Sequence, residues 1–250
     1  MPAYVRARVV NGDTMLHNNL IALVITFVVS MVWLRVNDYF AHKGWVSSHL
    51  SRKIIHMGTG PVFVLCWLLF DNAPIARYLA ALVPLLITIQ FALIGLGIIE
   101  DEAAVKAMSR SGNRREVLKG PLFYGIVFVI MTILFWKESA IGMTALMLMC
   151  GGDGLADILG RAYGKTHLPW APRKTWVGSL GMLLGGWIFV VFIIAVYTAL
   201  GALPGSLTSY IFPVTVIAVA GTIVESLPLN DIDNFTVTFA AVLLGLVLFP

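Results

Sequence analysis

Residues 150–179 read CGGDGLADILGRAYGKTHLPWAPRKTWVGS and connect the end of one apolar run to the start of another. Asp153 and Asp157 lie four residues apart, so they share one face if residues 148–159 are helical. Four cations follow them, namely Arg161, Lys165, Arg173 and Lys174. Two acids that face one way can hold a divalent metal, and arginine and lysine bind phosphates by charge-assisted hydrogen bonds. The stretch therefore predicts a site for phosphoryl or nucleotidyl transfer.

The composition predicts an integral membrane protein. Of the 250 residues, 59% are hydrophobic and only 12% are charged, whereas soluble domains carry about a quarter charged residues. We expect an all-α fold with about eight transmembrane helices in one bundle, since apolar segments of about 20 residues cross a bilayer as helices. The expected spans are residues 19–35, 54–70, 75–98, 121–136, 139–159, 177–201, 207–225 and 234–249. The fourth and eighth are short, so a bundle of seven is the alternative.

The chain forms a single polytopic domain, 1–250, in this interpretation, and its motifs lie between about 51 and 237. The net charge of +4 does not indicate nucleic-acid binding, because lysine and arginine in a membrane protein report topology first. Most of the 17 cations lie in loops 36–53, 99–120 and 160–176. Positive loops stay on the cytoplasmic or stromal side, so we expect these three loops on the inner face and both termini outside.

A second polar cluster precedes the second span. Residues 51–61 read SRKIIHMGTGP, with Arg52 and Lys53 at the span's edge and His56 three residues further on. On a helix, Lys53 and His56 lie near each other. The alternative is a topology signal plus a packed histidine.

A third cluster precedes the fourth span. Residues 113–125 read NRREVLKGPLFYG, and Pro121 suits the first turn of a helix. Lys119 then lies near the positive end of that helix, where anions are favoured. A solvated basic loop is the alternative, and Tyr124 is more typical of an interfacial belt than of catalysis.

The fourth cluster, GTIVESLPLNDIDNFTV at residues 221–237, is acidic although its loop falls on the basic side. Glu225 ends the seventh span, and Asp233 and Asn234 precede the eighth. An acidic loop that faces three basic ones suggests further metal ligands. The alternative is a helix start, because Asp233 or Asn234 is a good N-cap.

These clusters, in this order, resemble the phytol kinase branch of the polyprenol kinase family, whose relatives include farnesol kinases, dolichol kinases and CTP-dependent diacylglycerol kinases. The matching stretches are RKIIHMGTGPVFVLCWLLF at 52–70, LKGPLFYG at 118–125, GDGLADILGRAYGK at 152–165, PRKTWVGS at 172–179 and ESLPLNDIDNFTV at 225–237. The chain departs from the family pattern at Ile232, where paired acids are expected before the asparagine. Asp231 and Asp233 are therefore alternatives for that acid.

The resemblance implies transfer of the γ-phosphoryl group of CTP to an isoprenoid alcohol, with phytol as the first candidate. The product, phytyl phosphate, would serve tocopherol synthesis. The partners implied are the alcohol, the nucleoside triphosphate and the lipid bilayer. The implied location is a cyanobacterial or plastid membrane, with the active site on the cytoplasmic or stromal face.

Roles follow from the resemblance as expectations. Asp153 and Asp157 bind Mg²⁺, or one of them accepts the hydroxyl proton, and His56 completes the catalytic set. The further metal ligands expected are Glu225, Asp233 and Asn234. The cations expected to hold the triphosphate are Arg161, Lys165, Arg173 and Lys174. Those expected to position the transferred group, together with His56, are Arg52, Lys53 and Lys119.

Two other functions stay open from the sequence. A CTP:phosphatidate cytidylyltransferase-like enzyme also shows a GR…GK…KT stretch, and it would release pyrophosphate. The start RKIIH and the end ESLP…DN favour the kinase. An ion-coupled transporter of an anionic substrate would also place acids inside the membrane. Inverted repeats would favour that transporter, and the sequence contains no obvious ones.

Overall fold

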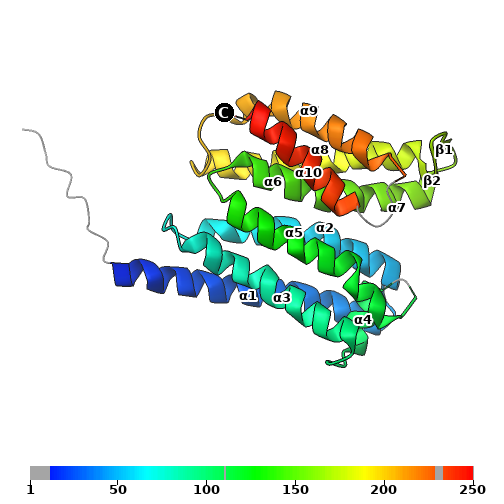
Figure 1. The fold of residues 1–250 in the computed structure, drawn as a ribbon, viewed down its shortest axis with the longest axis horizontal. Helices are drawn as coiled ribbons and strands as arrows, with labels where there is room; N and C mark the ends of the chain where they lie inside the picture. The colour runs from blue at the N-terminus through cyan, green and yellow to red at the C-terminus, as the bar shows by residue number, and fades with distance from the viewer. Residues whose placement is uncertain (1–11, 110, 229–232, 250) are drawn as a thin grey trace, which may run out of the picture.

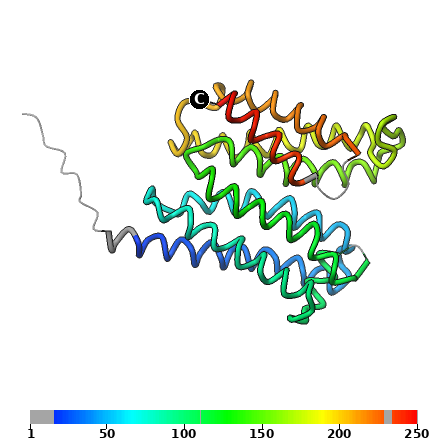
Figure 2. The backbone as a smooth tube through the Cα atoms, viewed as in Figure 1, coloured from blue at the N-terminus to red at the C-terminus, as the bar shows by residue number. Residues whose placement is uncertain are grey.

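The computed structural model describes residues 12–109, 111–228 and 233–249. Its elements are α1 (Gly12–His42), α2 (Ser48–Cys66), η1 (Trp67–Leu69), α3 (Ala76–Leu96), α4 (Glu102–Met108), η2 (Arg114–Leu118), α5 (Gly120–Leu134), α6 (Ala140–Met147), η3 (Leu148–Gly152), α7 (Asp153–Tyr163), β1 (His167–Leu168), β2 (Ala171–Thr175), α8 (Trp176–Ala199), α9 (Leu207–Glu225) and α10 (Asp233–Leu248). The long helices run side by side in one bundle, with α1, α2, α3 and α5 in one half and α6 to α10 in the other (Figures 1 and 2).

The prediction of an all-α membrane protein is confirmed, and each of the eight expected spans coincides with a helix. By length and composition, six helices of the described residues can cross a membrane, and α10 is a shorter apolar helix. The helix α2 is not among the six, because its first turns carry charged and histidine side chains. The fifth expected span is a continuous helical segment, 140–163, that consists of α6, η3 and α7.

The three basic loops lie at one end of the bundle. In Figure 1 the short helix α4 and the hairpin β1–β2 are at the same end as the start of α2, while the C-terminus is at the opposite end. The hairpin pairs His167 with Thr175 and Leu168 with Ala171 in antiparallel register. Thr175 also caps α8, since its hydroxyl accepts a hydrogen bond from the Gly178 N–H at 3.0 Å. The clusters found in the sequence therefore converge on one end of the bundle.

Small residues let α8 approach the segment that carries the two aspartates. A Cβ added at Gly181 would lie 2.8 Å from the Leu155 carbonyl oxygen, and one added at Gly185 would overlap the backbone of Gly151. Gly181 and Gly185, four residues apart, therefore form a helix-packing face. The close contact holds α7 against α8, so it fixes the height of Asp153 and Asp157 in the bundle.

Candidate active site

A wide turn precedes the two aspartates. Residues Leu148–Gly152 form a π-helix, a distortion that is frequent at functional sites. Here the Asp153 N–H bonds to the Cys150 carbonyl. The Met149 carbonyl accepts a hydrogen bond from outside the segment, from His56 Nε2 at 2.9 Å. The distortion therefore attaches the start of α7 to α2.

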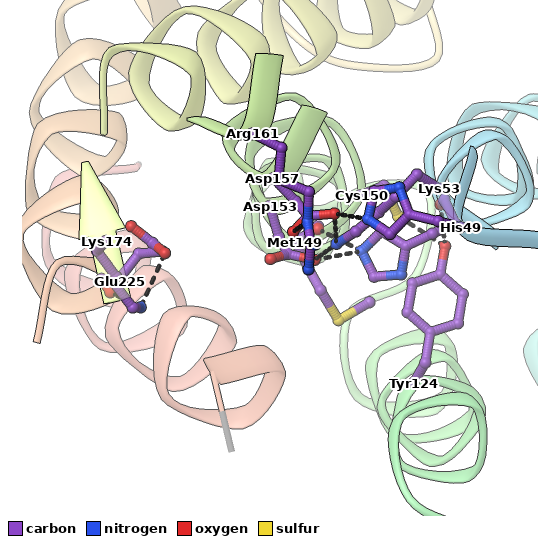
Figure 3. Close-up of polar contacts among 11 residues, drawn as sticks. His49, Lys53, Tyr124, Met149, Cys150, Asp153, Asp157, Arg161, Lys174 and Glu225 are labelled. Carbon is purple, nitrogen blue, oxygen red and sulfur yellow. Dashed lines mark hydrogen bonds and ion pairs between the residues drawn. The ribbon is translucent and has the colours of Figure 1, made fainter. Parts of the chain in front are cut away.

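The helix α2 presents a lysine and two histidines to these aspartates (Figure 3). Lys53 Nζ lies 3.0 Å from Asp153 Oδ2 and 3.8 Å from Asp157 Oδ2. His56 Nε2 lies 3.2 Å from Asp153 Oδ2, and His49 Nε2 lies 2.6 Å from Asp157 Oδ2. Carbonyl and carboxylate oxygens only accept hydrogen bonds, so both imidazoles donate through Nε2.

The two carboxylates differ in how they are held. Asp157 receives Arg161 Nε at 2.9 Å on Oδ1 and His49 on Oδ2. For Asp153, both the Lys53 and the His56 contacts fall on Oδ2. Burial lowers the pKa of His49, and the charge of Asp157 opposes that shift. Asp157 is thus engaged on both oxygens, whereas the two contacts of Asp153 share one oxygen and the residue lines the adjoining cavity.

Tyr124 of α5 connects the histidine to the π-helix. Its hydroxyl donates to the His56 carbonyl oxygen at 2.5 Å, so the Cys150 thiol, 3.0 Å away, donates to the tyrosine oxygen. The Tyr124 and His56 rings also stack, with their centroids 4.4 Å apart. Tyr124, expected as an interfacial residue, instead holds α2, α5 and the π-helix together around the imidazole.

A cavity of about 320 Å³ opens beside this cluster. Its polar lining includes Lys53, His56 and Asp153, which are joined there by other side chains from the basic and acidic loops: Arg52, Glu116, Lys119 and Asn234. The remaining lining is mainly apolar and comes from α1, α2, α3 and α5. The arrangement is a polar mouth joined to an apolar interior. The cavity brings together residues from all four sequence clusters. Glu225 and the four cations that follow Asp157 are not among its lining residues.

Glu225 and Lys174 form a separate pair (Figure 3). Lys174 Nζ lies 2.8 Å from Glu225 Oε1 and also contacts the Glu225 carbonyl oxygen. The roles expected for these two residues, a metal ligand for Glu225 and a phosphate contact for Lys174, stay predictions. The basic hairpin and the end of α9 are close enough for their opposite charges to pair with each other.

The other predicted residues divide into three groups. Arg161 is mostly exposed and bound to Asp157. Lys165 and Arg173 are exposed at the hairpin, at the same end of the bundle as the cavity mouth. Asp233 begins α10, and its side chain, like the whole of Asp231, lies outside the described residues.

The residues present fit a magnesium ion that arrives with a nucleotide. Among residues 12–109, 111–228 and 233–249, no group of three or more His, Cys, Asp or Glu side chains is arranged to hold a metal on its own. Mg²⁺ usually keeps several waters and binds through one or two carboxylates plus substrate phosphates. Asp153 and Asp157, one helical turn apart, offer such a pair, with the Asn234 amide at the same cavity.

Sequence reasoning missed His49 and the Tyr124–Cys150 contact. A signal for His49 was present, because His49, Lys53 and His56 are spaced by four and three residues and therefore share a helical face. Tyr124 and Cys150 are 26 residues apart, and nothing in their spacing indicates that a hydroxyl and a thiol meet. Only the packing of α5 on the π-helix shows that contact.

Comparison with known proteins places the chain in a family. No family model matches it, and no solved structure does. A probable phytol kinase of Triticum aestivum is 38% identical over 218 residues, which cover 86% of this chain and 73% of the relative. Phytol kinase 1 of Arabidopsis thaliana is 40% identical over 200 residues, 79% of this chain and 66% of the relative. Farnesol kinase of Arabidopsis thaliana is 37% identical over 227 residues, 90% of this chain and 74% of the relative.

All three of these relatives are described as chloroplastic. The fold and the cluster around Asp153 define a multi-pass membrane enzyme with a charged site at one end of its bundle. The sequence identity over most of the chain makes the assignment specific: the protein belongs to the phytol and polyprenol kinase family.

Proposed function

We propose that this protein transfers the γ-phosphoryl group of CTP to an isoprenoid alcohol, with phytol as the first candidate and phytyl phosphate as its product. The observation that carries the proposal is the cavity in which Lys53, His56 and Asp153 adjoin an apolar interior. A lipid alcohol needs both environments, because its chain belongs in an apolar space and its hydroxyl must meet a charged donor. The phytol and farnesol kinases among the relatives support the same substrate class.

In the proposed reaction the alcohol oxygen forms a bond to the γ-phosphorus, and the bond from that phosphorus to the β-bridging oxygen breaks. The nucleoside diphosphate leaves, and the hydroxyl proton goes to a base. Asp153 is better placed for this than Asp157, because Asp153 lines the cavity and Asp157 is held by His49 and Arg161. Positioned base catalysis of this kind contributes about 10² to 10⁴ in rate.

Lys53 and His56 stabilise charge in this scheme. Lys53 is close to both carboxylates, at 3.0 and 3.8 Å, so it can move between a carboxylate and a phosphoryl oxygen without losing an ionic partner. His56 donates through Nε2 to the Met149 carbonyl, and the same nitrogen lies 3.2 Å from Asp153 Oδ2. Arg52 and Lys119 at the cavity mouth, with exposed Lys165 and Arg173 at the same end, supply further positive charge for a triphosphate.

Asp153 and Asp157, with Asn234, are the residues that would hold Mg²⁺. Bound there, the ion would neutralise charge on the phosphate oxygens. We place the reaction on the cytoplasmic or stromal side of a plastid or cyanobacterial membrane, where the basic loops belong, and the product in tocopherol synthesis.

An assay of the purified protein tests the proposal. Each labelled nucleoside triphosphate is incubated with phytol, geranylgeraniol, farnesol, dolichol or diacylglycerol in the presence of Mg²⁺. We expect a lipid monophosphate together with CDP. Release of pyrophosphate with formation of a CDP-lipid would instead identify a cytidylyltransferase. If no alcohol causes consumption of a nucleotide, the kinase proposal fails and the transporter becomes the better hypothesis.

A further inference from the structure

The cavity continues well beyond the polar cluster. On the α2 side its lining passes from Lys53 and His56 to Phe63, and on the α5 side it passes from Tyr124 to Phe128. Phe63 is seven residues beyond His56, which is about 10 Å along a helix. This apolar depth is more than a phosphoryl group needs, so the proposed chemistry does not explain it.

The helix directions show which end of the cavity is deep. Both α2 and α5 begin at the end of the bundle that carries the basic loops, and α3 runs the opposite way (Figure 1). Phe63 and Phe128 therefore lie farther from the mouth than His56 and Tyr124. On α3 the deepest lining residue is Val83. All three of these deep side chains are buried.

Aromatic contacts hold the deep end rigidly. The Phe63 and Phe128 rings pack with their centroids 5.7 Å apart. Trp67, which is fully buried, packs on Phe63 at 5.9 Å, and Tyr124 packs on Phe128 at 4.7 Å. Each ring is thus supported from a second side, and neither can turn aside without disturbing a neighbour.

The wall between α3 and α5 is closed beside this point. A Cβ added at Gly125 would overlap the hydroxyl of Thr88, so the Thr88 side chain packs directly on the backbone of α5. Thr88 in turn donates to the Pro84 carbonyl at 2.6 Å, and its polar group is satisfied within α3. A chain that enters from the mouth therefore meets a wall on this side and the aromatic pair ahead of it.

We infer that this cavity binds the apolar chain of the acceptor alcohol, with its hydroxyl at Asp153, and that Phe63 and Phe128 limit the length of chain it accepts. The inference rests on the proposed function and adds to it a binding site and a basis for selectivity. A cavity of about 320 Å³ is at the small end of ligand pockets, which span about 300–1,000 Å³. It suits a short isoprenoid such as farnesol or phytol better than dolichol.

Photolabelling tests the site without any catalytic turnover. A farnesol analogue with a diazirine at the end of its chain is bound to the full-length protein in lipid nanodiscs, without nucleotide, and adducts are mapped by mass spectrometry. We expect adducts on α2, α3 and α5 near Phe63, Val83 and Phe128, reduced by excess phytol. Adducts confined to other helices, or insensitive to phytol, would overturn the inference even if the protein phosphorylates phytol.

Two substitutions test the limit on length. Phe128→Ala opens the deep end and should raise kcat/KM for dolichol relative to farnesol by about tenfold or more, the scale on which apolar pockets discriminate size. Ile87→Phe, also on the cavity lining, should lower kcat/KM for phytol more than for farnesol. The matched controls are Phe192→Ala and Ile89→Phe, whose native side chains are exposed on the outer surface.

The outcomes separate the inference from the proposed function. If Phe128→Ala changes the rates for all alcohols equally, or if Ile89→Phe acts like Ile87→Phe, the cavity does not select chain length. If the wild-type protein labels at α2, α3 and α5 but phosphorylates no alcohol, the binding site stands and the kinase reaction fails. A variant that does not fold is recognised by its lowered Tm. In that case the photolabelling of the wild-type protein decides whether the cavity binds the alcohol.

Discussion

Replacing Asp153 with asparagine is the sharpest test of the site. The substitution keeps the shape of the side chain and removes its charge, so the variant loses either a proton acceptor or a hard anionic ligand. In both cases turnover should fall by about 10² or more, which corresponds to roughly 2.7 kcal/mol in activation free energy. The assay is turnover of phytol at saturating alcohol over a range of Mg²⁺ concentrations.

The structure also gives the expected cost in stability. Lys53, whose side chain is only 10% exposed, loses the charged partner at 3.0 Å but keeps Asp157 at 3.8 Å. A hydrogen bond to a charged group contributes about 1.5–3 kcal/mol and a neutral one about 0.5–1.5 kcal/mol. The asparagine oxygen can still accept, so the loss in free energy of unfolding should be about 1 kcal/mol. The variant should therefore fold, with a small decrease in Tm.

Asp71→Asn is the matched control. Asp71 lies just after η1, at the opposite end of the bundle, where its Oδ1 accepts from Asn19 Nδ2 at 2.7 Å and from the Ala73 N–H at 2.8 Å. Its substitution should cost similar stability and leave turnover near the wild-type value. Partial rescue of Asp153→Asn by high Mg²⁺ would identify a metal ligand, and no rescue would favour the base. Normal turnover in a folded Asp153→Asn variant would refute the reasoning about the whole cluster.

Three further predictions concern topology, the hairpin and pH. Single cysteines introduced at Trp45, Ser111 and His167 should react with an impermeant thiol reagent from the same side of the membrane, and labelling from opposite sides would disprove one shared face. Lys174→Ala should lower Tm, because the largely buried Glu225 carboxylate loses its ammonium partner, and should raise the nucleotide KM by about ten- to a hundredfold if Lys174 also binds phosphate. A lower Tm with an unchanged nucleotide KM would show that the Lys174–Glu225 ion pair has only a structural role. Because the folded pKa of His49 is lowered, the unfolded chain binds more protons below about pH 6.5, so stability is lost as pH falls through that range. His49→Gln should reduce that loss in a Tm series, and an identical pH dependence would exclude His49 as its source.

Much of the site could be predicted because its signals are local. Asp153 and Asp157 are four residues apart, and Lys53 and His56 are three apart, so each pair shares a face as soon as the segment is helical. Acids at membrane depth are costly, so the position of Asp153 inside the expected span 139–159 also marks it as a candidate. The pairing of the Glu225 carboxylate with Lys174, across 51 residues, was not predicted. Spacing in the sequence gives no information about such a pair.

The sequence by itself determined the class of structure and the residues able to carry charge. Backbone in a bilayer must satisfy its hydrogen bonds internally, so the apolar segments could only become helices, and Gly181 and Gly185 already indicated a close helix contact. The tertiary structure decided which charges meet. Lys53 reaches Asp153 across 100 residues, and the Phe63 and Phe128 rings meet in the lining of a cavity that several helices share. The physical reason is that rotation and crossing of the helices select these contacts, and both depend on the packing of all the helices at once.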